Sequence, residues 1–215
     1  MQGLIAEAFP LFEQSGGCKV AVEIGLTSAL RKAIADGAAF DIALLPRADI
    51  DALARHGRIA QVSVADIARS AIGVAVRAGA PRPDITTVEA FKHAVVRAGS
   101  VTYSDGPSGL YIAGLMERLG LAEAMKSKTR LTTGPVAELL ARGEAELGLQ
   151  QIVAILPVKG ADLVGPLPSE LQNIIVYAAG ISAAAQQSGA ARDLIRFMAT
   201  PDVLRIIRDK GLEPG

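Results

Sequence analysis

The sequence predicts an α/β protein with mostly parallel sheets. Short apolar runs rich in Val and Ile alternate with amphipathic stretches of helical periodicity, and the connections between them are short. That alternation is typical of strand–helix–strand units. The periodicity is interrupted at "RAGAPRPD", residues 77–84, which indicates a change of lobe and not a flexible linker.

The first third of the chain is predicted to contain three helices and three strands. Residues 4–12 carry an apolar stripe at helical spacing, and Pro10 is expected to kink or shorten that helix. The strand "KVAVEI" (19–24) precedes a helix that begins with Thr27 or Ser28 as its cap and stops at Gly37. Strands follow at 41–46 and 71–76, with a helix over 48–57 between them.

The remaining two thirds continue the alternation. Thr86 and Glu89 have the spacing of a capping box for a helix over 88–99, before a strand at 100–104. A helix from 107, a helix–turn–strand unit over 135–155 and two extended segments around a Pro-rich turn follow. Two C-terminal helices complete the chain, and Thr200 is expected to cap the second of them.

Composition excludes several classes of protein. Lys plus Arg and Asp plus Glu both number 22, so no charge excess favours nucleic acid as a partner. Cys18 is the single cysteine, which rules out an intrachain disulfide. No apolar run approaches the roughly 20 residues of a transmembrane helix. The opening "MQGLIAEAFPLFEQ" has no basic start or apolar core, so no signal peptide is predicted.

The stretch "YSDGPSGLYIAGLMERLG", residues 103–120, is a candidate anion site. Ser104 ends a strand, and Ser108 and Gly109 open the following helix. The start of a helix offers free N–H groups and a partial positive charge, which suit a carboxylate or an oxyanion. The alternative is that Asp105 or Ser108 only caps its own helix.

Two other helix starts have a similar pattern. Thr27 and Ser28 follow the strand at 19–24, and "TTGP" (132–135) precedes Val136. Three such starts could hold one small anion at the carboxyl ends of the strands. Gln150 and Gln151 end another strand, where they either contact that ligand or bond to backbone.

Catalytic groups are not evident. His56 and His93 lie on amphipathic helices, where surface roles are expected, and Cys18 lacks a partner base. No metal-binding motif and no nucleotide-binding glycine loop is present, so neither a metal nor a cofactor is predicted. The catalytic residues of any enzymatic activity remain unknown at this stage.

Taken in order, several stretches resemble the molybdate-binding-protein-like branch of bacterial solute-binding proteins, which have the type 2 periplasmic-binding fold. The resemblance covers nearly the whole chain. Within that branch, the sequence is similar to an organic-anion subgroup that also includes aconitate isomerases. The stretches that carry it are "KVAVEIGLTSALRKAIADG", "FDIALLP", "DIARSAIGVAVRAGAPRPDITTVEAFKHAV", "TYSDGPSGLYIAGLMERLG", "GEAELGLQQIVAILPV", "GPLPSELQ" and "VYAAGIS".

The resemblance implies two lobes, 1–72 plus 179–215 and 73–178, with a small anion held in the cleft between them. It implies that this anion is bound by hydroxyls and backbone N–H groups, at Thr27, Ser28, Ser104, Ser108, Gly109 and Val136. Molybdate binders place a tyrosine where this chain has Gln151, which favours an organic carboxylate over molybdate. Arg69 and Ser70 could then pair with that carboxylate, the alternative being that Arg69 forms a surface ion pair.

The function implied is that of a monomeric receptor for an ABC-type transporter, with a membrane permease as its partner and the periplasm as its location. The alternative is an isomerase that moves a proton or double bond next to a carboxylate, with Asp105, Tyr103 or Glu138 as the base.

The N-terminus departs from the family pattern. Family members begin with a strand that leads into the first helix, whereas Met1 stands directly before that helix here. The first strand of lobe one is therefore predicted to be missing, which would leave neighbouring strands without backbone partners. A start codon placed too late, an artificially shortened chain or a degenerate gene copy would each explain this. If Met1 is the true start, the absence of a signal peptide predicts a cytoplasmic protein.

Overall fold

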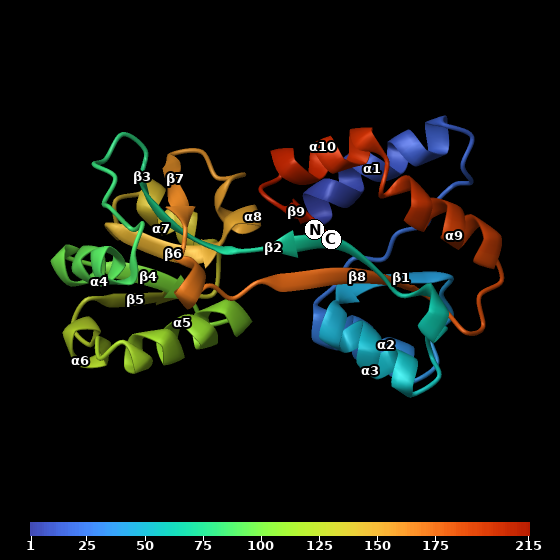
Figure 1. Cartoon of the computed structure of the whole chain (residues 1–215), viewed down its shortest axis with the longest axis horizontal. Coiled ribbons are helices and arrows are strands. Elements are labelled where there is room, and N and C mark those ends of the chain that lie inside the picture. The colour runs from blue at the N-terminus through green and yellow to red at the C-terminus, as the bar shows by residue number, and fades with distance from the viewer. The chain divides into compact units, whose positions relative to one another are not determined.

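The computed structural model of the chain contains two compact units (Figure 1). It describes the backbone of all 215 residues and every side chain except that of Pro107. The first unit comprises Met1–Arg69 and Ile175–Gly215, and the second comprises Ser70–Ile174. Each unit is described by itself.

The first unit is built on a four-stranded sheet of order β1-β8-β2-β9. Strand β1 pairs with β8 in antiparallel register, Ile42 opposite Ile181, and β2 pairs with β9 in the same sense. The elements of this unit are α1 (Gln2–Gln14), α2 (Thr27–Ala35), β1 (Ile42–Pro46), α3 (Arg47–Arg55), η1 (Gln61–Ser63), β2 (Ala65–Ser70), β8 (Ile175–Ile181), α9 (Ser188–Phe197), α10 (Pro201–Asp209) and β9 (Glu213–Pro214).

The predicted apolar stripe of the first helix is confirmed in part. Leu4, Ala8 and Phe12 are buried, and the Phe12 ring lies edge-on to that of Phe197, 5.4 Å between centroids. Pro10 neither ends nor shortens the helix, which runs on to Gln14. Burial of the stripe therefore outweighs the loss of the backbone bond that a proline removes.

The prediction of a strand at 19–24 is wrong. These residues form no regular element, and the side chains of Val22 and Ile24 are 45% and 54% exposed. A β-strand exists only by pairing with a neighbour, and β-propensity alone cannot supply the missing ladder.

The prediction that Thr27 or Ser28 caps the next helix is also wrong. Leu26 occupies the N-cap with extended backbone, and no side chain bonds to the free N–H groups there. Thr27 and Ser28 are the first two helical residues, a position from which a hydroxyl no longer acts as the N-cap.

The second unit has a five-stranded sheet of order β5-β4-β6-β3-β7. Strand β4 is parallel to β5 and β6, whereas β3 is antiparallel to β6 and β7. The elements are β3 (Ile72–Arg77), α4 (Val88–Arg97), β4 (Val101–Ser104), α5 (Pro107–Arg118), α6 (Ala122–Met125), β5 (Thr129–Thr132), α7 (Val136–Ala141), β6 (Leu147–Gln151), α8 (Ile152–Ile155), β7 (Ala161–Pro166) and η2 (Ser169–Leu171).

The predicted α/β class is confirmed, and the sheets are mixed. Parallel pairing joins β5, β4 and β6, while the other pairings given above are antiparallel. The expectation of mostly parallel sheets thus holds only at β5-β4-β6, because β3 runs against β6 and β7, and β8 runs against β1.

The five-stranded sheet is covered on both faces. One face packs on α4 and α5 through fully buried side chains that include Phe91, Val95, Ile112 and Leu115. The other packs on α7 and α8 through Ala137, Leu140 and Ile155. Burial on both sides fixes the strands that carry the candidate site.

Smaller predictions also need correction. Thr87, not Thr86, caps α4, because its hydroxyl accepts from the Ala90 N–H at 3.1 Å while Thr86 bonds to Asp84. Residues 152–155 form the helical turn α8 and do not extend the strand. Thr200 stands at the N-cap of α10, but its hydroxyl donates back to the Phe197 carbonyl instead of capping.

Among the helices described, none is both long and apolar enough to span a bilayer.

Candidate functional site

Polar residues gather where the three parallel strands of the second unit end. Ser104 of β4 lies beside Thr132 of β5 in the ladder. On the other side Tyr103 pairs with Leu149 of β6, so the register places Gln150 level with Ser104. Two hydroxyls and an amide therefore stand at one edge of the sheet, where the loops to α5, α7 and α8 begin.

The loop from β4 to α5 keeps the start of that helix uncapped. Gly106 is the N-cap residue, and none of the side chains that the structure describes makes a capping bond to α5, so the alternative in which Asp105 or Ser108 caps the helix is wrong. Ser104 is buried and Ser108 half-buried at this turn. The helix start thus presents backbone N–H groups beside two serines.

Gly109 allows the first turn of α5 to approach the end of β4. A Cβ atom at this position would lie 1.5 Å from the Ser104 carbonyl oxygen, so only glycine fits. The family resemblance implied Gly109 as a site residue; the structure shows the close approach that requires a glycine there.

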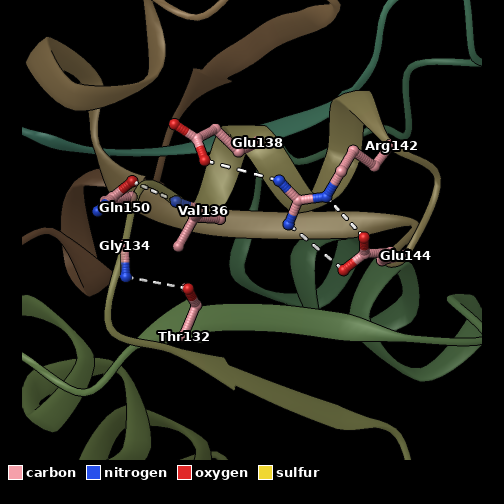
Figure 2. A network of polar contacts seen from close by, with 7 residues as sticks. All are labelled: Thr132, Gly134, Val136, Glu138, Arg142, Glu144 and Gln150. Carbon is pink, nitrogen blue, oxygen red and sulfur yellow. Dashed lines mark hydrogen bonds and ion pairs between the residues drawn. The ribbon is translucent and has the colours of Figure 1, made fainter.

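A second loop is tied together by side chains on its two sides (Figure 2). The Gly134 N–H donates to Thr132 Oγ1 at 3.0 Å, and the Val136 N–H donates to Gln150 Oε1 at 2.9 Å. The Asp105 N–H donates to the Thr132 carbonyl, also at 3.0 Å, which joins this loop to the first. Of the two roles predicted for Gln150, contact with a ligand or a bond to backbone, the structure thus shows the bond to backbone.

Charged groups flank the second loop on the outer side of α7. Arg142 contacts Glu138 at 3.6 Å and Glu144 at 2.6 Å (Figure 2). The bond from Arg142 holds the pKa of the Glu144 carboxyl below its usual range. Of the predicted base candidates, Glu138 is thus engaged in an ion pair, Asp105 is exposed, and Tyr103 packs against the main core.

Ser70 and Gln151 are brought together although 81 residues separate them. The buried Ser70 hydroxyl donates to Gln151 Oε1 at 3.3 Å. Arg69 lies one residue earlier on β2, opposite Glu213 of β9, with its side chain exposed. The structure thus brings together two candidate residues, Ser70 and Gln151, that were predicted separately, and leaves Arg69 outside that contact.

Gln172 is a supporting residue that sequence reasoning missed. Its amide accepts from the Ile72 N–H at 2.8 Å and donates to the Ile72 carbonyl at 3.0 Å, which fixes the start of β3 next to Gln151. A glutamine in a Pro-rich turn gives no sign of a partner 100 residues away. Thr27 and Ser28 belong to the first unit, where Thr27 is half-buried and Ser28 exposed.

The fold is that of periplasmic binding proteins. A protein described as the substrate-binding domain of a molybdenum ABC transporter from Clostridium difficile superposes with a TM-score of 0.84 at 14% identity, over 100% of this chain and 94% of that one. The periplasmic molybdate-binding protein of Azotobacter vinelandii gives 0.74 at 18% identity, over 100% and 95% of the two chains. At these identities the likeness concerns the fold, the one used by receptors of ABC transporters.

The family model for bacterial extracellular solute-binding proteins matches residues 1–213, and the chain belongs to that family. An aconitate isomerase from Pseudomonas sp. is 35% identical over 221 residues, which cover 100% of this chain and 84% of that protein. The predicted resemblance to molybdate-binding-like solute-binding proteins is therefore confirmed.

Proposed function

We propose that the chain is a solute receptor that binds a small organic carboxylate at the carboxyl ends of β4, β5 and β6. The observation that carries this proposal is the convergence of Ser104, Thr132 and Gln150 beside the uncapped start of α5. Hydroxyls and free N–H groups can stabilise the charge of a carboxylate by hydrogen bonds, without a charged side chain as its counter-ion.

The donors favour a ligand with several hydrogen-bonding groups. The amides of Gln150 and Gln151 can both donate and accept, which suits carboxylates and hydroxyls better than a tetrahedral oxyanion alone. Within the proposal Ser108 and Gly109 supply further contacts from the same unit. The predicted donor at Val136 is not free to do so, because its N–H is already held by Gln150. The predicted contacts at Thr27, Ser28, Arg69 and Ser70 belong to the same proposal. The receptor would be a monomer located in the periplasm, where it delivers its ligand to a permease in the membrane.

A second candidate function is the isomerisation of a small unsaturated carboxylate. The 35% identity to an aconitate isomerase over the whole chain favours it. A base would remove a proton from the methylene carbon next to the double bond, and the same proton would return at the far carbon of the allylic anion. No redox partner is needed. The hydrogen-bond donors that bind the carboxylate would also stabilise the allylic anion.

Asp105 is the base we favour for that reaction. It stands in the loop between Ser104 and α5, and its carboxylate is exposed, whereas Glu138 is paired with Arg142. Asp105→Asn would then abolish isomerisation while leaving carboxylate binding within a few fold.

The deciding experiment combines binding with turnover. The protein is screened by thermal shift with molybdate, sulfate, citrate, cis-aconitate and trans-aconitate, and the aconitate samples are then followed by proton NMR. A ligand at 100 times its dissociation constant adds about 2.7 kcal/mol of stability. A shift with a carboxylate but unchanged spectra supports the receptor, interconversion of the aconitates supports the isomerase, and a shift with molybdate alone contradicts both.

A further inference from the structure

A cavity of about 910 Å³ opens on the second unit, at the end of the sheet opposite the candidate site. Leu147, the first residue of β6, and Ala98, which follows α4 and precedes β4, lie in its wall. Ser104 and Gln150 stand toward the other ends of those same two strands. The volume is typical of sites that hold small molecules, and the carboxylate site proposed above does not use it. We refer to this space as the α4 cavity.

Small side chains keep the α4 cavity open. Ala90, Ala94 and Ala98 recur at every fourth position of α4 and its C-cap, so they share one face of the helix, and all three line the cavity. A second wall is residues 80–84, which include two prolines and lie in the loop from β3 to α4 (Figure 1). The floor consists of the buried side chains Val76, Ala145 and Leu147. An apolar ligand body would therefore meet apolar surface on both walls and on the floor.

The loop that forms the second wall is held in place. The Gly79 N–H donates to Asp162 Oδ2 at 3.3 Å, and Arg82 pairs with the same carboxylate at 3.5 Å. At the far end of the loop, Asp84 Oδ1 accepts from the Thr86 N–H at 2.9 Å and from its hydroxyl at 2.7 Å. These bonds and the fixed φ of two prolines pre-organise the cavity, so a ligand loses little binding free energy to the ordering of this loop.

The acidic side chains that line the α4 cavity already have partners. Asp84 is engaged at the end of the loop, and Glu89 pairs with Lys92 at 3.0 Å. Glu146 Oε2 accepts from the Gly99 N–H at 2.7 Å. These carboxylates thus bond to the protein's own walls.

Two arginines of the α4 cavity lack such partners. Arg77 ends β3 and Arg97 ends α4, and both line the cavity with exposed side chains. Among the residues that the structure describes, neither guanidinium makes a hydrogen bond or an ion pair. Arg77 Nη1 lies beside the turn at Gly143, 3.4 Å from where a Cβ atom would stand there. His93, one helical turn before Arg97, adds an imidazole to the same cavity. The α4 cavity thus combines apolar walls with unused, positively charged donors.

We propose that the α4 cavity binds an organic acid with an apolar ring. The ring would lie between the alanine face of α4 and residues 80–84, and its carboxylate would be bonded by Arg77 and Arg97. The planar guanidinium matches a carboxylate with two parallel hydrogen bonds, and a bond between charged groups is about twice as strong as a neutral one.

Both features of the α4 cavity are needed to choose this ligand. A small inorganic anion would leave the apolar walls in water, and a neutral ring would leave the two arginines unpaired. The proposal does not depend on the carboxylate site at the strand ends, where hydroxyls and N–H groups stand in place of arginines.

An amide NMR titration with 2-naphthoate tests the proposal, with 2-naphthamide as the neutral probe of the same shape. We expect saturable shifts from 2-naphthoate in the amides of Ala90, Ala94, Ala98 and residues 143–147. 2-Naphthamide should bind about tenfold more weakly, because it offers the arginines no charged acceptor.

Four variants separate the charge from the walls. Arg77→Gln and Arg97→Gln should each weaken 2-naphthoate binding about tenfold, and both positions are exposed, so the variants keep the fold. Arg55→Gln is the matched control: this exposed arginine of the first unit forms no ion pair among the described residues, and its loss should change nothing. Ala94→Phe fills the cavity and should abolish binding of both probes, while the amide spectrum keeps the dispersion of a folded protein.

Each of five results would overturn the proposal. Equal affinities for the two probes would mean that the arginines play no part. An equal loss in Arg55→Gln would reduce their effect to the charge of the whole protein. Binding that survives in folded Ala94→Phe would place the probe outside the cavity. Shifts confined to the amides of Ser108 and Gly109 would assign the acid to the strand ends and leave the proposed function standing. The absence of any saturable shift would mean that the cavity holds no such acid.

Discussion

Gln150 holds the start of α7 through its side chain: its Oε1 accepts the Val136 N–H at 2.9 Å, across 14 residues of chain. Val136 is fully buried, so this N–H has no access to solvent as a substitute partner. The bond links the end of β6 to the loop after β5, and so connects two of the three strand ends that form the candidate site.

Gln150→Leu should destabilise the protein by about 1–3 kcal/mol, because it leaves the buried Val136 N–H without an acceptor. Gln150→Glu keeps an acceptor oxygen at the same place and is the matched control. Urea denaturation measures both. Equal losses in the two variants would contradict a stabilising role for the acceptor oxygen.

Gly109→Ala should disrupt the loop after β4, because the added Cβ would lie 1.5 Å from the Ser104 carbonyl oxygen. We expect loss of several kcal/mol, roughly 2–4, and loss of carboxylate binding. Gly114→Ala, in the same helix, meets only Arg118 at 4.0 Å. It should stabilise by up to about 1 kcal/mol through helix propensity and leave binding intact. If Gly109→Ala left the free energy of unfolding unchanged, this would contradict the close approach of Gly109 to the Ser104 carbonyl oxygen.

Ser104 and Thr102 lie two residues apart on β4, and their substitutions are expected to have opposite effects on binding. Ser104→Ala should leave the fold intact and weaken carboxylate binding about tenfold, the cost of one hydrogen bond to a charged group. Calorimetric titration of the folded variant provides the measurement.

Thr102 Oγ1 is buried and has no partner within the described part of the chain. Thr102→Val should therefore be neutral or stabilising by about 1 kcal/mol, with binding unchanged, and it serves as the control for Ser104→Ala. A weaker ligand affinity in Thr102→Val would mean that β4 affects binding through its packing.

Acid should loosen the segment 20–24. Glu13 accepts from the Val20 N–H and from Lys19, and these bonds hold its pKa below the ordinary value of 4.5. A carboxyl whose pKa is lowered by folding contributes stability above its unfolded pKa, and that stability is lost as pH falls through the lowered value. NMR titration of Glu13 should show the low pKa, with faster exchange of the Val20 amide below it. In Glu13→Gln, exchange of this amide should no longer depend on that titration.

Much of the architecture follows from local pattern. Apolar periodicity predicts β1, β3, β4, β7 and β8 and the main helices, because burial of one face leaves a repeat of two or of 3.6 residues. The segment 19–24 carries the same pattern and forms no strand, since pairing depends on a neighbour that local sequence does not specify. Thr86 and Thr87 differ in role by one residue, which the capping pattern does not resolve.

The candidate site was predictable as a set of strand ends and helix starts. The residue types at Ser104, Ser108, Gly109 and Gln150 indicate anion chemistry, because they supply hydroxyls, amides or close backbone approach. The bonds between them were not predictable. The contacts of Val136 with Gln150, Ser70 with Gln151 and Gln172 with Ile72 span 14, 81 and 100 residues, and only the folded sheet brings those partners together.

The most direct test of carboxylate binding at the strand ends is an amide NMR titration of the protein with trans-aconitate, with molybdate as the comparison. The account predicts saturable shifts in the amides of Asp105, Gly106, Ser108 and Gly109, produced by the carboxylate and needing about tenfold more ligand to saturate in Ser104→Ala. Saturable shifts confined to other parts of the chain, or shifts of these amides with molybdate alone, would contradict it.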